Sequence, residues 1–128
     1  MQQNLWVIEN ENNGASYFSE KSYELGQLGG MWISEQQSAI NFRHRKSLAG
    51  YASDWHVAGD PTLIIILSGT LRLFLRNGEH RDFTKGDQFI AADYLDTDVD
   101  FDQSIHGHSA EVIGETTLEA VHIKLSKR

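Results

Sequence analysis

Alternation of apolar and polar residues is the feature that most restricts what this chain can fold into. Residues 71–76 read Leu-Arg-Leu-Phe-Leu-Arg, the period of two that a strand with one buried face requires. The dipeptide Asn77-Gly78 follows directly and is typical of a two-residue type I′ turn. We therefore predict a β-hairpin in which residues 71–76 pair with residues 79–83.

The rest of the chain also favours strands. Residues 40–45 alternate as well, with Ile40, Phe42 and His44 on one face, and residues 63–67 form a short apolar run. Glycines separate these segments, and no amphipathic helix of more than about two turns is indicated. We expect about eight to eleven short strands, in an all-β, antiparallel sandwich or small barrel whose inner face is filled by side chains or a ligand.

Composition limits the kind of protein this can be. A chain of 128 residues with 40% hydrophobic residues is expected to form one domain. It has no cysteine, so any metal would use imidazole, carboxylate, carbonyl or water ligands. The net charge of −7 argues against nucleic acid or an anionic membrane as partner. Without a signal peptide or a spanning segment, we expect a soluble, cytoplasmic protein that handles a small molecule.

Negative charge is concentrated in one later segment. Five aspartates lie between Asp93 and Asp102, in a stretch without strand periodicity. The simplest interpretation is a solvated connection, and the alternative is a lid or cation-attracting rim over a pocket. We favour the solvated connection.

The order of several short motifs resembles the cupin superfamily, in particular its small single-domain members. Trp55-His56-Val57-Ala58 is followed by an apolar strand that ends in Leu67-Ser68-Gly69, then by Asn77-Gly78-Glu79, Lys85-Gly86-Asp87 and Gly107-His108. The resemblance implies a double-stranded antiparallel β-helix, the jelly-roll barrel of the cupins. It covers somewhat more than the C-terminal half. Residues 49–128 would form the barrel core of a single domain, 1–128, and residues 1–48 would supply extra N-terminal strands.

The resemblance also implies a metal-binding pattern, which this chain keeps only in part. His56 falls on the first histidine of the first cupin motif, whereas Ala58 and Thr62 occupy the positions of its second histidine and its glutamate. His108 fits the histidine of the second motif, and His106, two residues away, would share its strand face. The predicted ligands of a divalent Zn, Fe, Mn or Ni ion are His56, His106 and His108. With two usual ligands missing, a protein without metal is the alternative.

Other side chains are candidates for a ligand pocket. Trp32, Phe42, His44 and Trp55 are predicted to line it, although core packing is the alternative for the aromatic rings and for His44. A pair of arginines, Arg43 and Arg45, could bind a carboxylate as a fork, but we favour a solvated strand face. The remaining histidines, His80 and His122, are expected to face outward.

Three functions remain open. The first is a metal-dependent enzyme that acts on a small organic substrate. The second is a metal-free domain that binds or senses a small molecule, and the third is a metal-free isomerase or epimerase with a histidine base. A histidine tightly paired with a carboxylate would favour the third. We also expect a homodimer, with the apolar residues 5–8 as an edge strand covered by the partner chain.

Overall fold

The computed structural model describes residues 1–128 and consists of eleven β-strands without a helix. Six strands form the larger sheet, and its neighbours are antiparallel except for one parallel pair, β1 with β9. In spatial order they are β2 (Ser16–Glu24), β1 (Gln2–Asn10), β9 (Gln88–Ala91), β6 (Thr62–Ser68), β11 (Leu118–Lys124) and β5 (Asn41–Ser47). No helix is present that could cross a membrane.

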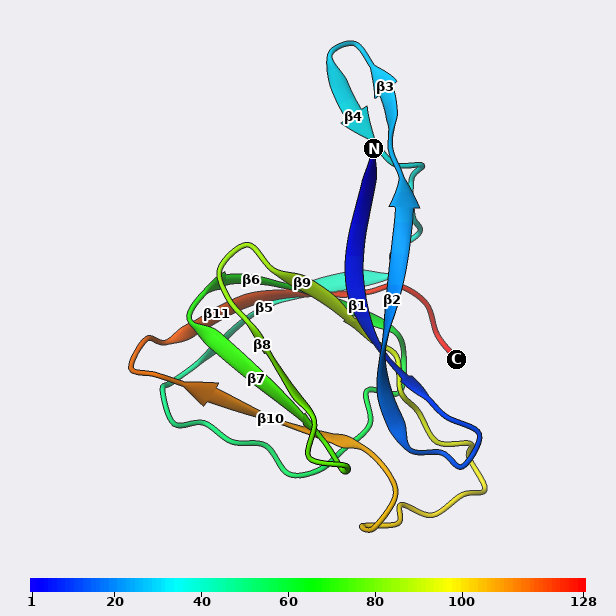
Figure 1. Ribbon diagram of the computed structural model, residues 1–128, viewed down its shortest axis with the longest axis vertical. Coiled ribbons are helices and arrows are strands. Elements are labelled where there is room, and N and C mark those ends of the chain that lie inside the picture. Colours follow the sequence, from blue (N-terminus) through cyan, green and yellow to red (C-terminus); the bar gives the residue numbers. More distant parts are fainter.

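A second sheet of three antiparallel strands lies beneath the larger one in Figure 1. Its order is β10 (His108–Ile113), β7 (Thr70–Leu75) and β8 (His80–Phe83). A separate hairpin of β3 (Gly26–Leu28) and β4 (Met31–Ile33) projects from the body. The predicted all-β jelly-roll architecture is confirmed, as two facing sheets that strand pairing does not join into a closed barrel.

The predicted hairpin between β7 and β8 forms, but its turn differs from the prediction. The N–H of Gly78 donates to the carbonyl of Leu75 at 3.1 Å, and the N–H of Leu75 donates to the carbonyl of Glu79 at 2.8 Å. Gly78 has a φ of 89°, whereas no residue other than glycine has a positive φ. A type I′ turn needs positive φ at both central residues, so this is instead a three-residue loop with a type I turn and a left-handed glycine.

The core lies between the sheets where apolar side chains of both meet. Alternate residues of β7 and of β6 point inward and are buried, and Phe83 packs on Phe89 with 4.4 Å between ring centroids. The twelve core residues are Ile8, Ile64, Ile66, Leu71, Leu73, Phe83, Phe89, Ala91, Ala110, Val112, Leu118 and Ala120. Period-two alternation therefore assigned the buried face of β7 correctly.

Strand register determines which side chains of β5 face the interior. Ala120, a core residue of β11, is directly opposite Arg45, and His122 is opposite Arg43. Residues that pair across antiparallel strands share a face, so Arg43, Arg45 and His122 face inward, and Phe42 and His44 face outward. This reverses the expected orientations. The inward face of β5 borders a cavity instead of the core, so polar residues occupy it.

The N-terminal strands belong to the larger sheet. β1, which holds the apolar residues 5–8, lies between β2 and β9 and is therefore not an edge strand, contrary to expectation. Its side chains alternate between two apolar clusters: Ile8 joins the main core, and Leu5 and Val7 form a smaller one with Ile90. Residues 6–8 of β1 pair on both sides within one chain, with β2 and with β9.

Candidate functional site

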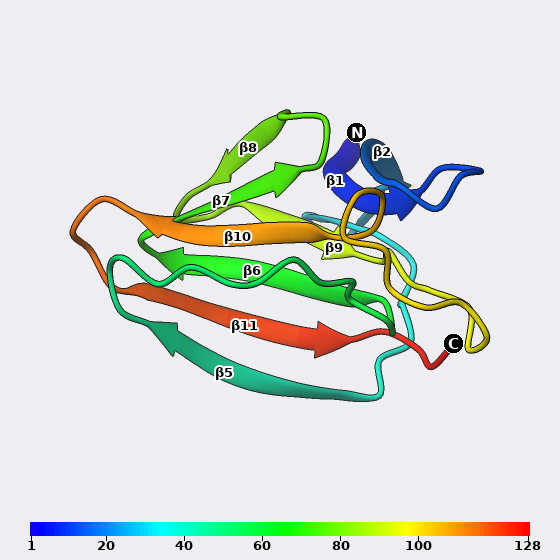
Figure 2. The ribbon, with the colours of Figure 1, turned by 90° about the horizontal axis from the view of Figure 1, so that it is seen from below.

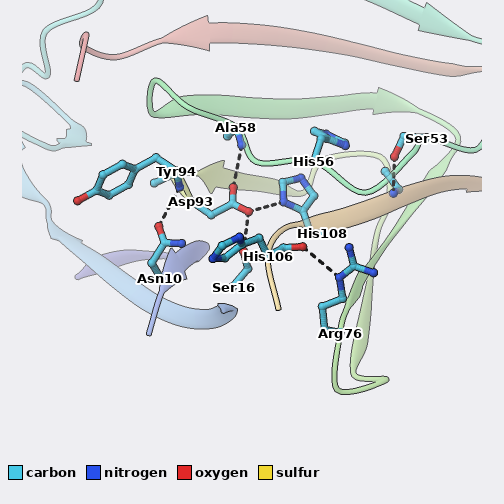
Figure 3. A network of polar contacts seen from close by, with 12 residues as sticks. Asn10, Ser16, Ser53, His56, Ala58, Arg76, Asp93, Tyr94, His106 and His108 are labelled. Atoms are coloured by element: carbon cyan, nitrogen blue, oxygen red, sulfur yellow. Dashed lines mark hydrogen bonds and ion pairs between the residues drawn. The ribbon is translucent and has the colours of Figure 1, made fainter. Parts of the chain in front are cut away.

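A buried carboxylate–imidazole pair lies at the start of β10. The Nδ1 atom of His108 is 2.7 Å from Oδ2 of Asp93, and the two side chains are 5% and 0% exposed. Asp93 also accepts hydrogen bonds from the Ser16 hydroxyl at 2.7 Å and from the Ala58 backbone N–H at 3.0 Å, as Figure 3 shows. A buried charge needs this degree of hydrogen bonding. The pair thus connects β2, β10, the loop after β9 and the segment before β6.

The hydrogen bonds keep Asp93 ionised. Burial by itself raises the pKa of this carboxyl because it disfavours the charged form. The hydrogen bond from His108 and its electrostatic attraction, together with the donors Ser16 and Ala58, outweigh burial and hold the pKa of Asp93 below its ordinary value. A carboxylate can only accept, so the proton of the shared hydrogen bond belongs to Nδ1 of His108. The other ring nitrogen, Nε2, then carries a lone pair when the imidazole is neutral.

The predicted approach of His56 to His108 is present. The two backbones exchange N–H···O=C hydrogen bonds of 2.9 Å each, and the ring centroids are 4.6 Å apart. The Nδ1 atom of His56 lies 2.7 Å from the carbonyl oxygen of Asp54; a carbonyl cannot donate, so this nitrogen carries the proton. Each ring therefore holds its proton on Nδ1 and leaves Nε2 free of a protein hydrogen bond.

A glycine makes this contact possible. Gly107 has a φ of 87°, and a Cβ atom there would lie 2.8 Å from the backbone oxygen of His56. Any side chain would therefore push the two histidine segments apart. A glycine is therefore required directly before His108, because the two backbones lie too close together for a side chain.

His106 does not join the other two histidines. Its Nδ1 atom accepts the Asp102 N–H at 2.9 Å, so its proton is on Nε2. That nitrogen packs against Gly14, where an added Cβ would lie 2.9 Å away. The shared strand face predicted for His106 and His108 is absent because β10 begins at His108, and the positive φ of Gly107 interrupts the alternation.

The side chains at this position do not fit a resident transition metal. Such an ion takes three or four protein donors, and only the Nε2 atoms of His56 and His108 are free at this site. Ala58 has no donor atom, and the Thr62 hydroxyl donates to the Asp60 carbonyl at 3.0 Å. No group of three or more histidine, cysteine, aspartate or glutamate side chains is arranged to hold a metal anywhere in the structure.

The predicted aromatic pocket residues are dispersed. Trp55 lies under the guanidinium of Arg76, with 4.0 Å between the guanidinium carbon and the ring centroid. Phe42 and His44 contact each other edge-on at 5.9 Å on the outer face of β5, and Phe42 is 68% exposed. Trp32, on the projecting β3–β4 hairpin, lines a separate and largely apolar cavity of about 310 Å³.

A cavity with a basic lining, the basic cavity, lies along the inward face of β5. β5 lies beside β11, and β11 beside β6, as Figure 2 shows. Its volume is about 570 Å³, and its lining consists of Asn41, Arg43, Arg45, Ala58, Thr62, His122 and Lys124, together with His44 and Lys46 from the alternate face of β5. None of these side chains is acidic. Ala58 also donates its backbone N–H to Asp93, so the cavity and the Asp93–His108 pair share a wall.

Sequence reasoning missed Asp93 and the inward-facing basic residues. Asp93 is one of five aspartates in its segment, and only its position two residues after β9 distinguishes it. The arginine pair suggests a carboxylate fork from the sequence alone, but the apolar residues Ile40 and Phe42 indicate the opposite orientation of the strand.

Comparisons with known proteins bear on the fold only. No family profile matches the sequence, and no curated protein matches it. Among solved structures, one from Neisseria meningitidis has 19% identity and a TM-score of 0.48 over 77% of this chain and 92% of that one. The Cnp3 cupin domain of Schizosaccharomyces pombe has 16% identity and a TM-score of 0.45 over 96% of this chain and 83% of the other.

A cupin-2 domain protein from Shewanella frigidimarina is similar at 16% identity and a TM-score of 0.45, over 68% of this chain and 69% of that one. Two of these three similar structures are therefore cupin domains by name. The fold of this chain is all-β, with two facing, mainly antiparallel sheets of the jelly-roll type.

Proposed function

We propose that this chain is a metal-free protein of cupin type that handles a small molecule, and that His108 accepts a proton from that molecule. The observation that carries the proposal is the buried 2.7 Å contact between Asp93 and His108. A carboxylate in this position fixes the tautomer of the imidazole and stabilises the imidazolium that forms when Nε2 takes a proton. The corresponding reaction class is isomerisation or epimerisation.

The chemistry of such a step needs no cofactor. His108 Nε2 removes a proton from a carbon next to a carbonyl group, and the C–H electron pair moves into an enolate. Asp93 stabilises the charged imidazolium. Return of the proton from the His108 imidazolium to a neighbouring atom of the enolate completes an isomerisation without net oxidation. In an epimerisation, water on the opposite face protonates the enolate, and His108 releases its proton to the resulting hydroxide.

Deuterium incorporation tests the step across several classes of small molecule at once. The protein is incubated in D₂O with a panel of small 2-oxo acids, keto sugars and uronic acids, and loss of the C–H signal is followed by proton NMR. We expect exchange in at least one compound, and we expect it to disappear in His108→Asn. His80→Asn is the matched control because His80 is exposed on β8. Exchange at the original rate in His108→Asn would overturn the proposal.

The tautomer of His108 gives a second test that needs no substrate. In the neutral form of each imidazole, long-range ¹⁵N–¹H NMR should show a protonated Nδ1 and an unprotonated Nε2 for His108, and the opposite for His106. A proton on Nε2 of neutral His108 would leave it unable to act as a base.

A metal-free binding or sensing domain is the second candidate. The observation in its favour is that the His108 side chain is only 5% exposed, which suits a structural pair as well as a base. Binding of a small molecule without any deuterium exchange would favour this candidate. A metal-dependent enzyme would be indicated if protein purified without chelator held stoichiometric Zn, Fe, Mn or Ni that the double variant His56→Ala, His108→Ala lost.

The expected single domain, cytoplasmic location and homodimer remain part of this proposal. Because β1 is internal to the sheet, a dimer would use another surface. The exposed apolar side chains of the β3–β4 hairpin, Leu28, Met31 and Trp32, are the surface that we propose for it. Sedimentation equilibrium, compared with a Met31→Lys, Trp32→Ser variant, would test this.

A further inference from the structure

We propose that the basic cavity binds its small molecule through an oxyanion, a carboxylate or a phosphate, held by Arg43 and Arg45. This inference rests on the proposed function, because it names the class of molecule that the protein handles. It is carried by three features of the cavity: its charge, the positions of the two arginines and the partial burial of Arg45 without a carboxylate partner.

This cavity is lined by positive charge, although the chain as a whole carries a net negative charge. The chain has a net charge of −7 and only 11 lysines and arginines, yet two arginines and two lysines line this cavity and no acidic residue does. Lys46 and Lys124 pair with Glu119 at 3.0 Å and with Asp60 at 3.3 Å. Arg43 and Arg45 have no carboxylate partner in the structure, so they are the cations available to a ligand.

The arginines stand two residues apart on the inward face of one strand. This spacing places their Cα atoms about 7 Å apart, a separation that two long side chains can bridge to a single anion. Arg45 is held in place: its Nε–H donates to the Ser47 hydroxyl at 3.0 Å, and its guanidinium carbon lies 5.3 Å from the Tyr51 ring centroid. The remaining guanidinium N–H groups suit the two oxygens of a carboxylate or phosphate.

Burial of Arg45 is only partly compensated by the protein. Burial lowers the pKa of this guanidinium. Electrostatic attraction to the nearby Tyr51 raises it and offsets only part of that lowering. Removal of water from a cation without a counter-charge is unfavourable. An anionic ligand in the cavity would supply the missing counter-charge, whereas a neutral ligand would leave Arg45 without one.

His122 lies directly opposite Arg43 on β11 and lines the same cavity. Its Nε2 atom is buried and has no hydrogen-bond partner, which is unusual for a buried polar atom. Burial, together with the positive charges of Arg45 and Arg43, lowers the pKa of His122 to about 4. The imidazole is therefore neutral near pH 7 and adds no charge of its own to the cavity.

Binding can be measured by NMR titration with inorganic phosphate, succinate and, as an uncharged control, glycerol in low-chloride buffer. The reporters are the Arg43 and Arg45 Nε–H signals and the His122 ring signals. We expect saturable shifts with phosphate or succinate, none with glycerol, and affinity reduced at least about tenfold in Arg43→Gln and in Arg45→Gln, as the loss of a charged hydrogen bond implies. The stronger of the two anions identifies the ligand class.

Arg72→Gln is the matched control, because Arg72 is a strand arginine outside the cavity and pairs with Asp82 at 2.7 Å. It should bind like the original protein. Arg43→Lys tests the fork, since it keeps the charge and loses the planar pair of donors. Linear, non-saturating shifts, or an equal loss of affinity in Arg72→Gln, would show only a solvated basic strand and overturn the inference.

The outcomes separate this inference from the proton-transfer proposal. His108→Asn should abolish deuterium exchange and retain anion binding. Deuterium exchange without saturable anion binding would overturn the anion site alone. Anion binding without deuterium exchange would overturn the role of His108 and leave the cavity as a binding site.

Discussion

The interior between the two sheets has a packed end and an open end, and the same strands run through both. At the packed end, β11 contributes Leu118 and Ala120, which belong to the main core. Further along the same face, β11 contributes His122 and Lys124, which line the basic cavity. One strand face thus changes from core to candidate site within four residues.

Strand β10 shows the same change in the opposite chain direction. Ala110 and Val112 are core residues, whereas His108, at the start of the strand, pairs with Asp93. The polar residues of both strands lie at the end where the segment before β6 crosses β10 at His56. Core residues and the polar residues of the candidate site therefore occupy different ends of one continuous interior, so substitutions at the two ends should have different effects.

The largest effect on stability is expected at the packed end. Phe89 is 1% exposed and stacks on Phe83 at 4.4 Å. Phe89→Ala should lower the free energy of unfolding by about 3–5 kcal/mol, because it removes a large buried ring and leaves a cavity. Arg43→Ala at the open end should change it by no more than about 0.5 kcal/mol. Urea denaturation would measure both, and equal losses would contradict the division into two ends.

The second effect concerns Asp93, the one fully buried charge at the open end. Asp93→Asn should reduce deuterium exchange by about 10³–10⁴-fold, because the amide no longer fixes the His108 tautomer. It should also destabilise the protein by about 3 kcal/mol at pH 7, as breakage of a buried pair does.

The pH dependence of that loss follows from the direction of the pKa shift. Burial raises the pKa of Asp93, but His108 and the other donors outweigh burial and hold it below its ordinary 3.8 in the folded state. Its contribution to stability is therefore complete above pH 3.8 and disappears as the pH falls through the lower, folded value. The difference between Asp93→Asn and the original protein should shrink in that acid range, and a difference that is constant down to about pH 2 would contradict this account.

A smaller effect should come from Gly107, where the two histidine segments meet. Gly107→Ala should cost about 1–3 kcal/mol for the positive φ, and more because a Cβ would lie 2.8 Å from the His56 backbone oxygen. Gly86→Ala is a matched control, since Gly86 has a φ of 91° with no atom within 4 Å of an added Cβ. Guanidinium denaturation of both variants isolates the cost of the close contact. If both variants lose the same free energy of unfolding, the close contact at His56 adds nothing to the cost of Gly107→Ala.

The sequence predicted which side chains face the interior at the packed end, but not at the open end. The alternation at residues 71–76 identified the buried leucines of β7, because a packed core leaves a regular apolar period. The same rule failed on β5. There, Phe42 lies on the outer face and is 68% exposed, and the inward face carries arginines. A strand that borders a polar cavity has no apolar signal on its inner side.

The candidate site shows the same limit. The proximity of His56 and His108 was predicted from the resemblance, and in the structure the two residues pair through their backbones. The partner Asp93 was not predicted, because five aspartates in one segment look alike until tertiary contacts bury one of them. His106 was misplaced since one positive φ, at Gly107, interrupts the strand.

The smallest effect should be the acid sensitivity caused by His122. In the folded protein its pKa is lowered from 6.5 to about 4, first by burial and then by Arg45 and Arg43. Below pH 6.5, His122 therefore becomes protonated in the unfolded chain but stays neutral in the folded protein. The free energy of unfolding falls as the pH drops toward 4. His122→Asn should remove this slope of the free energy of unfolding between pH 6.5 and 4, a range above the one in which Asp93 titrates.

Two comparison variants test whether His122 at the open end causes the loss of stability between pH 6.5 and 4. Arg45→Gln removes one positive neighbour of His122, so the pKa of His122 in the folded protein should rise. The slope should then end at a less acidic pH, and the total loss of stability should be smaller. His80→Asn should leave the slope unchanged, because His80 is exposed on the opposite sheet. A slope that persists in His122→Asn would mean that another group titrates there, and the basic cavity would then not be the part of the interior that responds to acid.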